Sequence, residues 1–206
     1  EENFPKDLTG WEIEAFQREK INLGLFDASD DDLIMFSDSD EIPDPNSIQS
    51  LNLKKKYAIF LQKFFVYKIN VFNKYETPWE GTRICKKKDL RSFTHLRKEI
   101  RQKNLNKPFW NLKYEKSIQI IDKGGWHFNN LYNIKTISKK LRTFQHIEFS
   151  DEKYSSEENI RKKIFNLEDL FGRKQKYERV EIDDDFPEYI RCNLKNFENY
   201  IQKKND

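Results

Sequence analysis

The longest apolar stretch of the chain, residues 57–72, places the strongest constraint on its fold. Aromatic and β-branched side chains dominate this stretch, which is typical of β-strands. Gln62, Lys63, Lys68 and Asn70 interrupt it, and no run approaches the roughly 20 apolar residues that span a bilayer. We therefore expect one or two strands here and no membrane-spanning segment in this chain.

Hydrophobic residues make up only 36% of the 206 residues, but the apolar side chains that are present are large. The sequence contains 17 Phe, 9 Tyr and 4 Trp, which is atypical of disordered chains. A few bulky side chains can fill a core. We predict a single domain over residues 1–206, with a core over about 9–192 and a helical tail over about 193–206 that frays after Lys195.

Neither the charge nor the cysteines indicate a specific partner. The chain has 38 Lys and Arg against 35 Asp and Glu, for a net charge of +3. Cys85 and Cys192 are far apart and form no CxxC pair, which excludes a cysteine zinc site and a disulfide framework and predicts a reducing compartment.

Helix and strand patterns alternate along the chain, which indicates a mixed α/β fold. The segment TGWE at residues 9–12 predicts a capping box that opens a helix ending near Gly24. The segment LIMF at residues 33–36 is typical of a buried parallel strand. Further elements are expected as a strand over 118–121, a turn over 78–81, and helices over 46–53, 86–103, 133–144 and 156–171.

An acidic motif, SDSDEIP at residues 37–43, follows the predicted strand 33–36 directly. Asp38 and Asp40 are two residues apart, so in an extended chain both point to the same side. Both can then face one Mg²⁺ or Mn²⁺ ion that bridges to a diphosphate. We expect Glu41 to brace the turn. A solvated acidic turn is the alternative explanation, because Asp favours turns.

Two of the 3 histidines lie near the predicted ends of strands or helices. His127 belongs to the segment GWHF at residues 125–128, and His146 follows the predicted helix 133–144. A neutral imidazole is a common metal ligand, so either can complete a metal site begun by Asp40. A histidine that is hydrogen-bonded within an aromatic core is the alternative for each.

The segment 86–103 is strongly basic, with eight Lys and Arg against two acidic residues. It either neutralises a phosphate-bearing ligand, contacts nucleic acid, or forms a solvated surface. The chain contains no zinc-finger, Walker, GxSxG, HExxH or GxGxxG motif, so hydrolase and dinucleotide-binding functions lose support.

Taken together, these motifs resemble glycosyltransferase family 17, the family of the β-1,4-mannosyl-glycoprotein β-1,4-N-acetylglucosaminyltransferases. The resemblance spans roughly residues 9–192, and the order and spacing of DxDEIP and GWHF are more specific than either motif alone. The segments that carry it are WEIE at 11–14, SDSDEIP at 37–43, GWHF at 125–128, KL at 140–141 and FQH at 144–146.

The resemblance implies a GT-A-like fold with a mixed, mostly parallel sheet flanked by helices. The first strand of that fold has no counterpart before Trp11, so we expect the domain to lack it. The implied reaction is the metal-dependent, inverting transfer of a sugar, with UDP-GlcNAc as the expected donor, to a glycan acceptor. The Lys- and Asn-rich composition without paired cysteines favours the cytoplasm, at the periphery of a membrane where glycans are assembled.

The same resemblance assigns roles at the metal. Asp40 is expected to bind Mn²⁺ or Mg²⁺ directly, and Asp38 to hold the ribose or a metal-bound water. His127 or His146 is the expected additional ligand. Arg91 in the basic segment is expected to contact the donor.

Inversion by direct displacement also needs a carboxylate that deprotonates the acceptor hydroxyl. Glu148 is preferred because it follows the GWHF block. Asp122, at the end of the predicted strand 118–121, is nearly as good, and Glu80 and Glu41 are further options. Trp126 and Trp79 are candidates for stacking on a sugar ring, and packing in the core explains either equally well.

A second class of function also agrees with the sequence. A non-catalytic module with a degenerate transferase fold would bind a glycan or a nucleic acid without turnover. For the transferase itself, no nucleic-acid partner is expected. A more distant alternative is a metal-dependent phosphotransferase that uses the same DxD.

Overall fold

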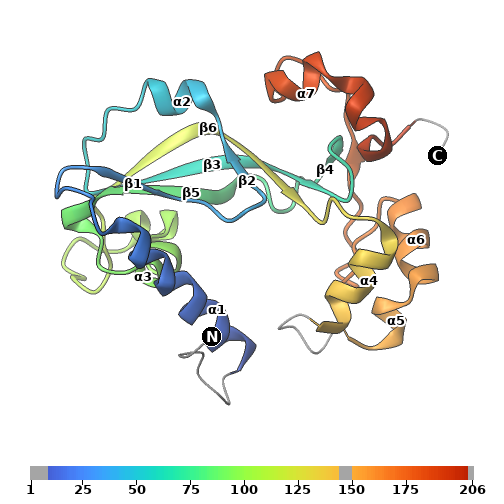
Figure 1. Ribbon diagram of the computed structural model, residues 1–206, viewed down its shortest axis with the longest axis horizontal. Coiled ribbons are helices and arrows are strands. Elements are labelled where there is room, and N and C mark those ends of the chain that lie inside the picture. The colour runs from blue at the N-terminus through green and yellow to red at the C-terminus, as the bar shows by residue number, and fades with distance from the viewer. Residues whose placement is uncertain (1–8, 144–149, 204–206) are drawn as a thin grey trace. The chain divides into compact units, whose positions relative to one another are not determined.

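A computed structural model describes residues 9–143 and 150–203 of the chain. The chain forms two compact units that alternate along the sequence. Unit 1 consists of Glu1–Phe36, Leu53–Ile59 and Arg83–Ile120, and unit 2 consists of Ser37–Asn52, Phe60–Thr82 and Ile121–Asp206. The strands that contribute residues to both units are β3 (Tyr57–Val66), β5 (Trp79–Lys86) and β6 (Ile118–Asn129), which are labelled in Figure 1.

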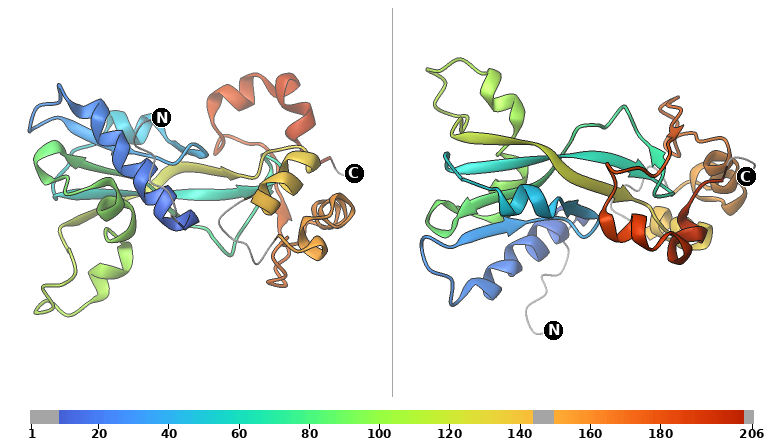
Figure 2. Two further views of the ribbon diagram at one scale, coloured as in Figure 1. Left: turned by 60° about the horizontal axis from the view of Figure 1, so that its bottom comes forward. Right: turned by 90° about the horizontal axis from the view of Figure 1, so that it is seen from above.

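Unit 1 combines strand residues with short helices. The helical elements are α1 (Gly10–Lys20), η1 (Ile21–Leu25), η2 (Lys87–Asp89), α3 (Phe93–Lys98) and η3 (Gln102–Asn106). The predicted capping box is confirmed: Thr9 Oγ1 accepts from the Glu12 amide, and the Glu12 carboxylate accepts from the Thr9 amide. Helices α1 and α3 pack side by side (Figure 2).

The strand β1 (Leu33–Phe36) corrects one expectation. It was predicted as a buried parallel strand, but it pairs antiparallel with β5. Its side chains alternate between exposed and buried, and Leu33 is 51% exposed. This alternation is typical of an antiparallel strand that packs one face on the core and leaves the other to solvent.

Within the part of the chain that the structure describes, the strands form a 7-stranded sheet in the order β1-β5-β3-β4-β7, with β6 beside β3 and β2 beside β6. The three further strands are β2 (Glu41–Pro43), β4 (Val71–Phe72) and β7 (Glu178–Arg179).

The mixed α/β class is confirmed, but the expected predominance of parallel pairing is wrong. The pairs β1–β5, β2–β6, β3–β4 and β4–β7 are antiparallel. The Tyr57 amide donates to the Ser117 carbonyl, and further along both strands the Tyr67 amide donates to the Asn129 carbonyl. The paired residues advance together along the two strands, so β3 and β6 are parallel. For β3 and β4 the short connection is the reason: residues 67–70 join them, whereas parallel neighbours need a crossover of about a dozen residues.

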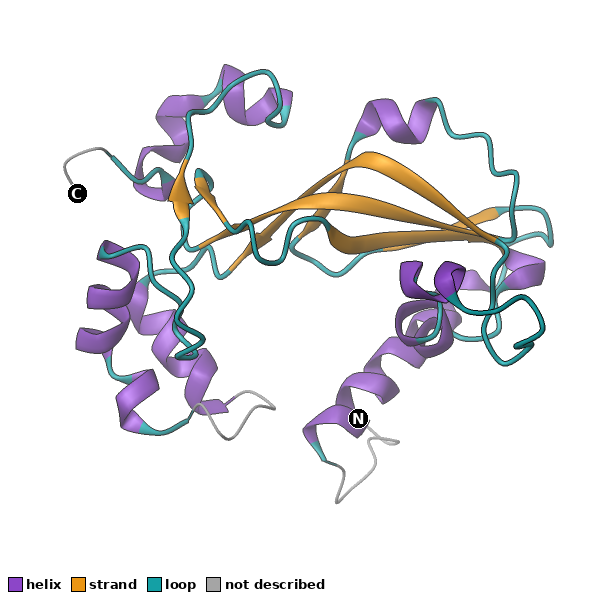
Figure 3. Ribbon diagram, turned by 180° about the vertical axis from the view of Figure 1, so that it is seen from behind, coloured by secondary structure: helices purple, strands orange, loops and turns teal. Residues whose placement is uncertain are grey.

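Unit 2 places helices next to its part of the sheet. These are α2 (Pro45–Gln49), α4 (Ile134–Thr143), α5 (Glu152–Ser155), α6 (Glu157–Phe165), α7 (Glu188–Cys192) and η5 (Leu194–Tyr200). The helices α4, α5 and α6 contact one another (Figure 3). No helix among the described residues is long and apolar enough to cross a membrane.

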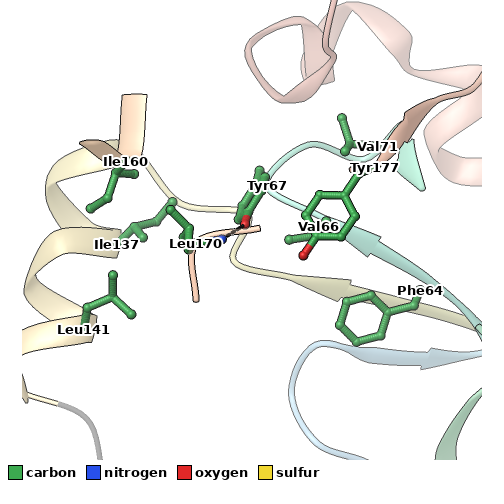
Figure 4. Close-up of a cluster of buried hydrophobic side chains, with 9 residues drawn as sticks. All are labelled: Phe64, Val66, Tyr67, Val71, Ile137, Leu141, Ile160, Leu170 and Tyr177. Carbon is green, nitrogen blue, oxygen red and sulfur yellow. Dashed lines mark hydrogen bonds between the residues drawn. The ribbon is translucent and has the colours of Figure 1, made fainter. Parts of the chain in front are cut away.

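One hydrophobic cluster joins α4 and α6 to β3 in unit 2. Ile137 and Leu141 of α4 and Ile160 of α6 belong to it (Figure 4). The Leu170 amide donates a 3.1 Å hydrogen bond to the hydroxyl of the buried Tyr67. The cluster therefore fixes the position of α4, and Ile137 and Leu141 of this helix also line the pocket of the candidate site.

Several predicted boundaries differ from the structure. Residues 78–81, expected as a turn, belong mostly to β5, and the expected helix 86–103 is broken into η2 and α3 because Ser92 caps a new helix start. The strand expected over 118–121 continues to Asn129. The helix expected over 156–171 ends at Phe165, since Leu167 has a positive φ of 56°.

The tail after Lys195 was expected to fray, which is wrong for the residues described. The Ile69 amide donates to the Tyr200 carbonyl at 2.9 Å. The Asn70 side chain accepts from the Gln202 amide at 2.8 Å and donates to the Gln202 carbonyl at 3.1 Å. These contacts tie the tail to the residues between β3 and β4.

Candidate functional site

Pairing of β2 with β6 brings the two most specific sequence motifs together within unit 2. Glu41 lies opposite His127, and Pro43 lies opposite Gly125. The Phe128 amide donates a 2.9 Å hydrogen bond to the Asp40 carbonyl, which extends the pairing to the acidic motif. The motifs SDSDEIP and GWHF therefore occupy neighbouring strands.

Gly125 is the residue that permits this close approach. Its φ is +129°, a conformation that side-chain-bearing residues rarely adopt, and a Cβ atom placed on it would be 2.1 Å from the Ile42 carbonyl oxygen. The Asp44 amide also donates to the carbonyl of Gly124 at 3.0 Å. Gly125 thus permits the pairing of β2 with β6, whereas Gly124 permits a close approach to Phe60 of β3.

A pocket of about 350 Å³ opens beside the paired motifs. Both polar and apolar side chains line it. Its lining residues are Asp38, Asp40, Trp79, His127, Asn129, Asn130, Ile137, Lys140, Leu141 and Phe171. The predicted metal-site residues Asp38, Asp40 and His127 therefore share one cavity.

Asp40 and His127 contact each other in the lining of the pocket. Their Oδ2 and Nε2 atoms are 3.2 Å apart, and the His127 side chain is only 5% exposed. Burial raises the pKa of Asp40, but the hydrogen bond and charge of His127, with the charge of Lys140, hold the pKa below its ordinary value. This carboxylate is thus kept ionised inside the pocket.

Aromatic rings fix the orientation of His127. Phe64 meets the imidazole edge-on at 4.3 Å between centroids, and Trp79 lies 4.7 Å away on a tilted plane. The Nδ1 atom of His127 is buried and has no hydrogen-bond partner among the described residues. The ring is therefore positioned by packing, with Nε2 directed at Asp40.

Glu41 braces the acidic turn, as the sequence predicted. It is 4% exposed. One carboxylate oxygen accepts from the Trp79 indole at 2.7 Å, and the other accepts from the Asp38 amide at 3.1 Å. Glu41 thus links the backbone of the DxD motif to an aromatic side chain of the pocket.

Lys140 supplies a positive charge to the pocket, a role that the sequence analysis did not assign. Burial lowers its pKa, and the charge of Asp40 opposes that effect. Its Nζ atom donates to the Asn130 side chain at 2.9 Å. In the sequence, Lys140 is at helical spacing from Ile137 and next to Leu141, so it lies within the apolar face of α4. A lysine in an apolar helix face is the feature that could have pointed to this role.

Other predicted site residues lie elsewhere. Trp126 is on the opposite side of β6 from His127, where its indole donates to the Asp185 carbonyl at 2.7 Å and its ring joins a second hydrophobic cluster. Asp122 is exposed and lies within β6, outside the pocket lining. Arg91 belongs to unit 1 and lines a different hollow.

Two predicted residues, His146 and Glu148, lie outside the described residues. The expected metal ligand His146 and the expected base Glu148 therefore stay predictions. Trp79, in contrast, lines the pocket and is fixed there by Glu41.

The pocket offers one carboxylate and one imidazole in contact, which are donor types that divalent ions take. The residues described contain no group of three or more His, Cys, Asp or Glu side chains able to hold a metal alone. The Asp40 Oδ2 and His127 Nε2 atoms, 3.2 Å apart, are in hydrogen-bond contact, so an ion held by both groups would replace the proton between them. Magnesium-type ions commonly take one or two carboxylates and complete their shell with phosphates and waters.

Comparison with known proteins identifies no relative: no protein-family model, no curated protein and no solved structure matches this chain.

Proposed function

We propose that this chain is a metal-dependent, inverting glycosyltransferase, similar to family 17, that moves a sugar from a UDP-sugar to a glycan acceptor. The observation that carries the proposal is the register of β2 on β6. It joins the two motifs on which the family resemblance rests, and it puts the carboxylates of one and the imidazole of the other into a single pocket. UDP-GlcNAc is the proposed donor.

In this proposal, Asp40 and His127 hold Mn²⁺ or Mg²⁺, and Asp38 binds the ribose or a water on the ion. The ion, when bound, draws off the negative charge that develops on the leaving diphosphate. Lys140, on the wall formed by α4, offers a second positive charge for the same diphosphate. Trp79 presents an aromatic surface to the sugar.

For the acceptor side, we propose Glu148 as the base that removes the proton from the hydroxyl, with Asp122 as the second candidate. The exposed position of Asp122 outside the pocket lining favours Glu148 of the two. We place the reaction in the cytoplasm, at the periphery of a membrane where glycans are assembled.

Calorimetric titration of UDP-GlcNAc tests the proposal, first with Mn²⁺ and then with EDTA. We expect binding that requires the metal and that weakens at least about tenfold in Asp40→Asn, because the variant loses a charged ligand. The matched control is Asp27→Asn, which removes an exposed carboxylate of unit 1. Far-UV circular dichroism verifies that each variant is folded.

Two results would contradict the assignment. If Asp40→Asn bound UDP-GlcNAc with Mn²⁺ as tightly as the unaltered chain does, Asp40 would not be a metal ligand. Binding of a glycan, with no affinity for any UDP-sugar in the presence of Mn²⁺, would instead favour the non-catalytic module.

A further inference from the structure

The segment between η3 and β6 exposes an unusual set of apolar side chains in unit 1. Phe109, Trp110 and Leu112 are 82%, 70% and 93% exposed. Single exposed hydrophobic residues are common, but three within four positions form a patch of the kind that marks a binding surface. Figure 2 shows this part of the chain as a long loop between the short helices and β6.

Local contacts hold the apolar residues at the tip of the loop. The Lys116 ammonium donates to the Pro108 carbonyl, which closes the base of the loop. The Asn111 amide donates to the same carbonyl at 3.1 Å, and the rings of Phe109 and Trp110 meet edge to face at 5.0 Å. The three side chains are therefore presented by a braced turn.

Lysines flank this apolar tip along the chain. Lys103, Lys107 and Lys113 are exposed on either side of it. The neighbouring acid, Glu115, accepts hydrogen bonds from the backbone amides of Lys116 and Ser117, so its charge is directed into the base of the loop. The exposed rim of the tip is predominantly basic.

The apolar side chains of the loop do not pack against a hydrophobic core among the described residues of unit 1. Phe109 and Leu112 border an open hollow of about 410 Å³, whose other lining residues include Arg91, Lys113 and Glu99. The apolar side chains are thus not covered within unit 1 by the described residues.

We propose that residues 107–116 form a membrane-docking loop, which inserts Phe109, Trp110 and Leu112 into the headgroup region of an anionic bilayer. The flanking lysines then contact lipid phosphates. Apolar side chains combined with a basic rim are the requirements for binding at a bilayer surface, and Trp is favoured at that depth. This inference is independent of the proposed sugar transfer.

A bilayer explains the composition of the tip better than a nucleic acid does. Leu112 is the most exposed of the three apolar residues and has no ring that would stack on a base. An aliphatic side chain beside two rings instead suits the mixed environment of acyl chains and headgroups.

Co-sedimentation with vesicles tests the docking loop. One set contains phosphatidylcholine alone, and the other contains about 30% phosphatidylserine, which supplies the negative surface potential. We expect binding to the anionic vesicles that falls as salt is added. Changing Phe109, Trp110 and Leu112 together to Ser reduces the partition coefficient at least about tenfold, because no apolar group is left to insert.

Two control variants make the result specific. Phe26→Ala removes a ring that is 89% exposed in the same unit but is followed by Asp27 and Asp30–Asp32, so it should bind vesicles like the unaltered chain. Changing Lys103, Lys107 and Lys113 to Gln should lower binding to the level seen with neutral vesicles.

Retained vesicle binding by the triple serine variant would overturn the proposal. So would salt-dependent binding to single-stranded RNA without vesicle binding, or a dimer that this variant abolishes, since the patch would then serve another partner. Every replaced apolar side chain is exposed, so an unchanged melting temperature is expected and separates loss of docking from loss of folding.

Discussion

Glu41 is a buried carboxylate that does not line the pocket but orients residues that do. Both of its oxygens are used, one by the Trp79 indole and one by the Asp38 amide. The pair Asp40 and His127 lies immediately beyond this link. At the scale of residues, the site therefore depends on the hydrogen bonds that Glu41 makes to the acidic motif and to Trp79.

Glu41→Gln tests that network. An amide has only one acceptor oxygen, so one of the two donors, the indole or the Asp38 amide, loses its partner. We expect the free energy of unfolding to fall by about 2 kcal/mol, in the range for a buried unsatisfied group, and the affinity for UDP-GlcNAc with Mn²⁺ to fall severalfold. Urea unfolding and calorimetry measure the two effects.

The control for this substitution is Glu181→Gln, which alters an exposed carboxylate of unit 2. It should leave both quantities unchanged. An unfolding curve of Glu41→Gln identical to that of the unaltered chain would show that the Glu41 contacts do not stabilise the turn.

At the scale of elements, the decisive feature is the pairing of β2 with β6. Their register decides which residues of the two motifs meet, because side chains alternate between the faces of a strand. His127 thereby enters the pocket, while Trp126, its neighbour, packs on the other side. A shift of one residue would reverse the two.

Gly125→Ala is expected to disrupt this pairing. The added Cβ atom would meet the Ile42 carbonyl and would also strain a backbone with φ of +129°. We predict a loss of at least about 2 kcal/mol in the free energy of unfolding, consistent with a strained backbone combined with a displaced strand. Chemical denaturation measures it.

Gly24→Ala is the matched control, because a Cβ atom at Gly24 meets nothing within 4 Å. Its effect should be neutral or slightly stabilising, since alanine restricts the unfolded chain. If both substitutions changed stability equally, the close approach of β2 and β6 would not be the cause.

At the scale of the whole molecule, stability depends on pH through buried carboxylates such as Asp169. Its side chain is 1% exposed and accepts from the Arg173 guanidinium, the Tyr177 hydroxyl and the amides of Phe171 and Arg173. Burial raises the pKa of Asp169, but these hydrogen bonds outweigh burial and hold the pKa below its ordinary value.

The lowered pKa of Asp169 predicts acid sensitivity. The unfolded chain takes up the proton first, at a pH near the ordinary pKa of about 3.9. The contribution of Asp169 is therefore complete above that pH and is lost as the pH falls through the lower pKa of the folded state. Asp169→Asn should cost about 3 kcal/mol at neutral pH and progressively less below pH of about 4.

Urea unfolding at neutral and acidic pH measures the difference in the free energy of unfolding between Asp169→Asn and the unaltered chain. Asp184→Asn serves as the control, because the Asp184 carboxylate is fully exposed in its ion pair with Arg191. A destabilisation by Asp169→Asn that stays constant from pH about 7 to about 3 would contradict the ionised role of Asp169.

Residues and elements whose structure depends on near neighbours were predicted well from the sequence. The capping box at Thr9 and Glu12, the strands within residues 57–72 and the helix α4 agree with expectation. The acidic brace Glu41 also agrees, and Asp38, Asp40 and His127 line one pocket, while their role at a metal stays a prediction. These features depend on side-chain capping, strand propensity and short motifs, which act over a few residues.

The tertiary structure alone decided what depends on distant partners. It made β1 an edge strand, gave the sheet its antiparallel pairs, turned Trp126 away from the pocket and brought Lys140 into it. The pairing partner of a strand and the burial of a lysine depend on residues far along the chain. The sequence thus determined the chemical groups and their local elements, and long-range packing determined which of those groups share one pocket.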